Sequence, residues 1–149
     1  MKKTVLIIAL AALALLLCAC GGAPKEIDAQ ALAQELAALP FEDELSPAPE
    51  GTAEHVYKIE GAEESYIYIG SGATAEEVAV FSFADEAGAK AALEALQTRV
   101  EAQKAAFESY VPAELQRLDN ALLRQSGNCA VLCVAAGDQA EEIVSKYLG

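Results

Sequence analysis

The four cysteines of this 149-residue chain are the residues whose type and spacing point most directly to chemistry. Two of them lie in Leu17-Cys18-Ala19-Cys20, at the end of an uncharged apolar run that begins at Thr4, after the basic start Met1-Lys2-Lys3. A basic start, an apolar core and a cysteine preceded by a small residue are typical of the signal of a bacterial lipoprotein. We expect Cys20 to be the lipidated residue, because the residue before it is small, whereas a bulky leucine precedes the other cysteine.

An uncleaved membrane anchor and an ordinary secretory signal are the alternatives for this segment. The apolar run has 14 residues, which is short for a bilayer span of about 20 residues. Cleavage as a lipoprotein would remove residues 1–19 and attach diacylglycerol to the thiol of Cys20, leaving residues 20–26 as lipidated cysteine and tether. Acyl chains contribute about 0.8 kcal/mol per buried CH2. The sequence therefore predicts a lipid-anchored protein on the extracytoplasmic face of the cell membrane.

The remaining chain is strongly acidic. The formal net charge of the whole chain is −13, and processing would leave eight basic residues against 23 acidic ones, a formal charge of −15. Such a domain is repelled by phosphate backbones and by anionic lipid headgroups, so nucleic acid is excluded as an expected partner. Residues 27–149 have the length of one domain, and an extracytoplasmic protein partner is compatible with its charge.

The other two cysteines, Cys129 and Cys133, lie in a run of apolar residues that is typical of a buried strand. In an extended strand their Cα atoms would be ~13 Å apart, beyond the roughly 7 Å that a disulfide allows. We interpret them as small buried residues. A thiol nucleophile or a metal-binding pair is the alternative, and its further ligands would come from elsewhere in the chain.

Apolar periodicity and turn residues divide the domain into alternating helices and strands. The predicted elements are a helix from Asp28 to Pro40, strands at Glu54–Ile59, Ser65–Ile69 and Glu77–Phe83, a long helix at Glu86–Tyr110, a helical turn at Glu114–Leu118, strands at Ala121–Gln125 and Cys129–Ala135, and a final helix to Leu148. Short loops between successive strands favour antiparallel pairing. The predicted fold is a single α+β domain, with a largely antiparallel sheet of about five strands and helices packed over it.

Side-chain roles follow from these elements. Asp28 and Asp85 are expected to cap helices, and Asp138 with Glu141 to form a capping box. Glu42-Asp43-Glu44 is expected to be a solvated loop. Of Glu76 and Glu77, we expect one to face solvent and the other to cap or pair, with Arg99 able to bridge to a carboxylate such as Glu77. These roles are structural.

The middle of the chain resembles a known family. The run Gly72-Ala73-Thr74-Ala75-Glu76-Glu77-Val78-Ala79-Val80-Phe81, the long helix with Arg99 and Gln103, the run Phe107-Glu108-Ser109-Tyr110-Val111-Pro112 and the closing hairpin occur together. This ordered set is similar to domain-of-unknown-function family 4358, whose members are small surface lipoproteins of clostridial-type Gram-positive bacteria. The resemblance implies a membrane lipoprotein over roughly Ile27 to Leu148. It implies no activity, and no catalytic residue is transferred.

Three kinds of function are compatible with these features. A non-catalytic binding or accessory module is favoured by the anchor, the small size and the lack of a recognisable catalytic set, and no cofactor signature is present. A surface hydrolase acting on cell-wall or peptide material would need His55, the only histidine. A lipoprotein that binds a small ligand or a divalent metal is the third. Its metal site would use oxygen ligands suited to Ca2+, drawn from Glu63, Glu64, Glu76 or Glu77.

Overall fold

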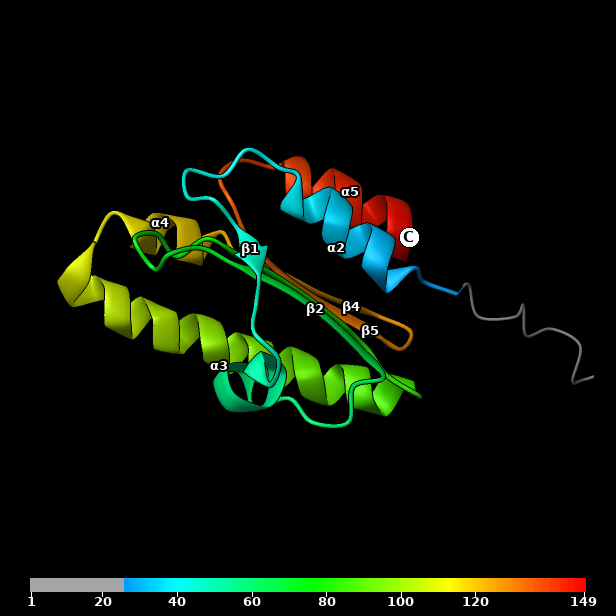
Figure 1. Cartoon of the computed structure of the whole chain (residues 1–149). Helices are drawn as coiled ribbons and strands as arrows, with labels where there is room; N and C mark the ends of the chain where they lie inside the picture. The colour runs from blue at the N-terminus through cyan, green and yellow to red at the C-terminus, as the bar shows by residue number, and fades with distance from the viewer. Residues whose placement is uncertain (1–25) are drawn as a thin grey trace, which may run out of the picture.

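The computed structural model describes residues 26–149, which form a three-layered α+β domain (Figure 1). Its centre is a five-stranded sheet with the order β1-β2-β3-β5-β4, in which every neighbouring pair is antiparallel. The strands are β1 (Ser46–Pro47), β2 (Glu64–Ile69), β3 (Glu77–Ser82), β4 (Leu122–Ser126) and β5 (Cys129–Val134). The predicted fold class and the antiparallel sheet are therefore confirmed.

The two central strands, β3 and β5, are buried along their whole length. Successive side chains of a strand point to opposite faces, and both faces of these strands are apolar. Val78, Val80 and Val131 lie on one face, and Ala79, Phe81 and Leu132 on the other. Strand β3 is therefore an interior strand that is covered on both sides.

Helices α2 (Ala29–Ala37) and α5 (Gln139–Leu148) cover one face of the sheet side by side (Figure 1). The Asp28 side chain accepts a hydrogen bond from the Ala31 N–H at 2.8 Å, so the predicted cap is present. The capping box predicted at Asp138 is wrong. Its backbone has φ −99° and ψ 3° rather than the extended conformation that a capping residue usually adopts, and its side chain makes no capping bond.

The long helix α3 (Glu86–Tyr110) runs along the other face, followed by the short α4 (Glu114–Asp119). Asp85 caps α3 by accepting from the Gly88 N–H at 2.9 Å. Helical spacing places a buried stripe against the sheet: Ala89, Ala92, Leu96, Val100 and Phe107. The helix ends before Pro112, as predicted, because the residue before a proline disfavours the helical conformation.

The strand predicted at Glu54–Ile59 is wrong, since residues Ala53–Tyr57 form one turn of π-helix (η2). The interpretation relied on alternation of apolar residues, but Ala53 and Tyr57 are four residues apart and both buried, which a helical turn also achieves. The turn ends at Lys58, which has a left-handed backbone with φ 59°. The edge of β2 is paired instead by β1, a segment in which no strand was predicted and which contains Pro47. Proline is tolerated on an edge strand.

The predicted signal and the lipidation residue Cys20 lie outside the described residues. Within residues 26–149, no helix is both long enough and apolar enough to cross a bilayer. The structure therefore describes the folded domain, whereas the lipid anchor is a prediction from the sequence.

Candidate ligand-binding cleft

Two consecutive carboxylates, Glu76 and Glu77, lie at the start of β3, and both are buried, at 3% and 2% exposure. The prediction that one of them faces solvent is wrong. Neighbouring residues in extended backbone point to opposite sides, but loops and helices cover both sides at this end of the sheet. Burying a carboxylate is costly unless it is paired, so the partners of each one indicate its role.

Glu76 is surrounded by donors. Its carboxylate accepts hydrogen bonds from the backbone N–H of Glu42 at 3.0 and 3.1 Å, from the N–H of Asp43 at 2.9 Å and from the Thr74 hydroxyl at 3.1 Å. The Arg117 guanidinium lies 3.6 Å away. Glu76 therefore fastens the segment before β1 to the β2–β3 loop. The segment Glu42-Asp43-Glu44 is a loop, as predicted, but it is not simply solvated. Its backbone N–H groups bond to Glu76, and the Asp43 carboxylate accepts from the Ser71 N–H and hydroxyl.

Glu114 and Arg117 of α4 complete this fastening. A Glu114 oxygen accepts from the Ala75 N–H at 2.8 Å and from Arg117 Nη1 at 2.5 Å, while Arg117 Nη2 donates to Glu42 at 2.7 Å. Both side chains of the α4 pair are about nine-tenths buried. We name the set of Glu42, Glu76, Glu114 and Arg117 the Arg117 cluster. Its buried carboxylates are all paired, so its role is structural.

Glu77 is paired on one oxygen only. Its Oε2 accepts from the Tyr57 hydroxyl at 2.5 Å, from Arg99 Nε at 3.3 Å and from Arg99 Nη2 at 3.2 Å. The Arg99 guanidinium also lies over the Tyr57 ring, 5.4 Å from its centroid. Oε1 of Glu77 is buried and accepts no hydrogen bond within the described part of the chain. The predicted bridge between Arg99 and Glu77 is confirmed, and it leaves one carboxylate oxygen without a donor.

Tyr57 is fixed as a hydrogen-bond donor in this group. Burial, followed by the negative charge of Glu77 and its hydrogen bond, raises the pKa of the Tyr57 hydroxyl well above its ordinary value. The hydroxyl therefore keeps its proton at any physiological pH. The Arg99 guanidinium is a permanent cation, so neither side chain is suited to accept a proton from a substrate.

Glu77 and Arg99 lie at a cleft of about 590 Å³ between η2, the β2–β3 loop and the C-terminal half of α3. Val56 and Tyr110 are part of its lining and are 44% and 69% exposed, and they are the large apolar side chains that the described domain exposes most. The lining residues that the argument uses are Val56, Glu77, Arg99, Gln103, Phe107 and Tyr110. The cleft thus combines a buried ion pair with apolar and aromatic walls, the composition expected of a ligand site.

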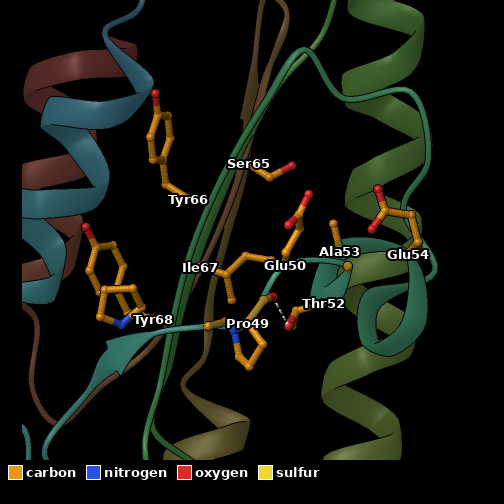
Figure 2. Close-up of a pocket in the computed structure, with 12 residues that line it drawn as sticks. Pro49, Glu50, Thr52, Ala53, Glu54, Ser65, Tyr66, Ile67 and Tyr68 are labelled. Carbon is orange, nitrogen blue, oxygen red and sulfur yellow. Dashed lines mark hydrogen bonds between the residues drawn. The ribbon is translucent and has the colours of Figure 1, made fainter.

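A second, smaller hollow of about 310 Å³ lies between β2 and the segment from Pro47 to Glu54. Figure 2 shows its lining: Tyr66 and Tyr68 point toward the α2 side of the sheet, and Glu50, Thr52 and Glu54 lie on the other side. The Thr52 hydroxyl donates to the Pro49 carbonyl at 2.6 Å. The carboxylates here are exposed and no buried polar atom of this hollow lacks a partner, so we do not assign it a ligand.

The residues proposed for catalysis from the sequence lie elsewhere. His55 is exposed on η2, makes no side-chain hydrogen bond to the described residues and lines neither hollow. Cys129 and Cys133 are free and buried in β5, as predicted. Burial raises the pKa of each thiol to about 12, so neither provides a thiolate near neutral pH. The geometry gives the hydrolase alternative no histidine at the cleft.

The carboxylates considered for a metal site are also not brought together. Glu64 pairs with Ser82 at one end of the β2–β3 ladder, whereas Glu77 pairs with Ile69 at the other. Five residue steps along a strand separate these ends by ~16 Å. Within residues 26–149, no three histidine, cysteine or acidic side chains are grouped to hold a metal ion. The structure therefore does not bring Glu64 and Glu77 into one metal site.

The fold is that of a small α+β domain with a cleft at one end of its sheet. The chain belongs to the family described as Domain of unknown function (DUF4358), which matches residues 41–135. The matched segment contains all five strands, η2, α3 and the whole cleft. Neither the curated proteins nor the solved structures provide a match to this chain.

Proposed function

We propose that the protein is a lipid-anchored binding module on the extracytoplasmic face of the cell membrane, and that the cleft beside Glu77 is its ligand site. Lipid on Cys20 would hold the module to the membrane, and the folded domain would carry the recognition. The observation that carries the ligand site is the unpartnered Oε1 of Glu77. The anchor is supported by the charge, length and cysteine placement of the N-terminal segment.

The contrast between neighbouring carboxylates argues against a purely structural role for Glu77. An unpaired buried acceptor costs about 1–3 kcal/mol, and more for a charged group. The domain avoids this cost at Glu76 and Glu114, where donors surround the buried oxygens. Within residues 26–149, the buried side-chain oxygen left without a hydrogen-bond donor is Oε1 of Glu77, beside the cleft. A ligand that donates a hydrogen bond to Oε1 would offset this cost.

Binding is favoured over catalysis by the groups that surround Glu77. Tyr57 retains its proton, Arg99 retains its charge, and both donate to the same Glu77 oxygen. These side chains hold one geometry and exchange no proton with a substrate near neutral pH. An extracytoplasmic protein partner is part of the proposal, as one source of the group that enters the cleft.

The anchor is tested by replacing cysteines in the signal. We expect Cys20→Ala to abolish incorporation of an alkyne-labelled fatty acid in cells and to leave the precursor unprocessed. Cys18→Ala is the matched control, and it should be labelled like the natural chain. Label that persists in Cys20→Ala, or that is lost in Cys18→Ala, contradicts the assignment.

The cleft is tested by filling it. Ala106 lies in its lining on α3, and Ala105 is the adjacent exposed residue outside it. We expect Ala106→Phe to weaken cleft binding at least tenfold, because the ring occupies the space, while Ala105→Phe leaves it unchanged. The measurement is an NMR screen of a chemically diverse fragment library against the full-length chain in lipid nanodiscs. NMR chemical-shift changes that are confined to residues outside the cleft, or that are equal in the two variants, contradict the proposed site.

A further inference from the structure

We propose that the group bound in this cleft is a peptide-like amide that carries an apolar or aromatic side chain. The inference rests on the proposed ligand site and specifies its chemistry. Three features of the cleft support it: the charge balance at Glu77, the arrangement of donors and acceptors, and the polar-to-apolar order of side chains along α3.

The charge balance excludes a ligand head with a net charge. Glu77 and Arg99 already neutralise each other across 3.2 Å, and Glu77 is 2% exposed. A further ammonium or carboxylate at this place would leave one charge unpaired in a poorly solvated site, which is costly. A neutral head that hydrogen-bonds without adding charge avoids this penalty.

The ion pair offers one acceptor and one donor to such a head. Within residues 26–149, Oε1 of Glu77 accepts no hydrogen bond. Arg99 reaches Glu77 through Nε and Nη2, so its Nη1 is left to donate to a ligand. A peptide group has the complementary pair, an N–H donor and a carbonyl acceptor. Oε1 is covered, whereas the Arg99 side chain is 21% exposed. The ligand carbonyl would therefore reach Arg99 from the cleft, and the ligand N–H would reach Oε1 once the lining over it opens, with the Arg99–Glu77 pair kept.

The order of residues along α3 places the apolar part of the ligand. Gln103 lies one helical turn beyond Arg99 on the same face, and its amide can donate or accept. Phe107 and Tyr110 follow on that face and line the cleft together with Val56 of η2. The 11 residue steps from Arg99 to Tyr110 rise ~16 Å, the length of about five extended residues. The cleft therefore suits a short peptide segment better than a single compact molecule.

The test compares probes that share a phenyl ring and differ in the head group. N-acetyl-L-phenylalanine methylamide is neutral, phenethylamine is cationic and phenylacetate is anionic. We titrate each into the full-length chain in lipid nanodiscs, with empty nanodiscs as the blank. We expect the neutral amide to bind at least tenfold more tightly than either charged probe. Its binding should be lost in Ala106→Phe and retained in Ala105→Phe. N-acetylglycine methylamide, which lacks the ring, should bind at least tenfold more weakly.

Charged probes that bind in the cleft as tightly as the amide would overturn the inference and leave the proposed ligand site standing. Absence of amide binding also overturns it, and the diverse fragment screen then decides separately whether the cleft binds ligands. The mirror-image amide distinguishes two sources of the same chemistry. Preference for the L form indicates a protein segment, whereas preference for the D form indicates a cell-wall peptide, and either preference supports the inference.

Discussion

Replacing Arg117 with methionine is expected to lower the free energy of unfolding by about 3–5 kcal/mol, the usual cost of removing one partner from a buried ion pair. Arg117 is 10% exposed and contacts carboxylates from three separate segments, at Glu42, Glu76 and Glu114. Methionine keeps an apolar stem of similar length but leaves two buried carboxylates without their cation. Urea denaturation followed by far-UV circular dichroism measures the loss.

Arg124→Met is the matched control for this prediction. Arg124 is 43% exposed and pairs with Glu141 on the surface. Exposed ion pairs contribute about 0–1 kcal/mol, so this variant should unfold almost like the natural chain. Equal losses in the two arginine variants would show that the Arg117 cluster does not hold the loops together.

Replacing Glu77 with glutamine is expected to lower the free energy of unfolding by about 2–4 kcal/mol. The change removes the negative charge to which Arg99 and Tyr57 both donate hydrogen bonds, and it leaves the Arg99 guanidinium without its ion-pair partner. The loss stays below that of a fully buried pair because Arg99 is partly exposed and gains solvation. The same denaturation measurement applies, with NMR of the Tyr57 ring to show whether the local packing persists.

Glu64→Gln serves as its control, because Glu64 lies at the opposite end of the same ladder and is exposed. It accepts from the Ser82 and Tyr66 hydroxyls. Glutamine can accept one of these bonds through its carbonyl, and its amide can donate to the other hydroxyl. We expect a change within about 0.5 kcal/mol, as for most surface substitutions. A Glu77 variant no less stable than this control would mean that Glu77 contributes nothing to the fold.

Long periodic elements were predictable from the sequence. The 25 residues of α3 repeat an apolar stripe over several turns and begin at an aspartate cap, so residues Glu86 to Tyr110 were predicted as they occur. The β4–β5 hairpin was recognisable from Gly127, which has φ 52°. Asn128, the next residue of the turn, does not have a positive φ. Its side-chain amide instead donates to the Phe83 carbonyl at 2.7 Å.

Short segments were not predictable in the same way. Five residues of η2 fit both a helical turn and a strand, and the tertiary position of Tyr57 decided between them. Because this turn was predicted to be a strand, the side of the cleft formed by η2 was not recognised from the sequence. Arg99 and Glu77 were recognised as possible partners, but Tyr57 and Val56 were placed on a strand. A single turn of π-helix is common at functional sites, and its position beside Glu77 is the signal that only the structure supplies.

The most direct measurement of the central claim follows the side-chain carboxyl carbons of glutamate by NMR. The full-length chain is labelled with 13C-glutamate in nanodiscs, and the Glu77 resonance is assigned with Glu77→Gln. On saturation with the fragment that binds the cleft most tightly, we predict that the Glu77 resonance shifts while those of Glu76 and Glu114 do not. A saturating fragment that leaves the Glu77 resonance in place would contradict the assignment of its free oxygen to ligand binding.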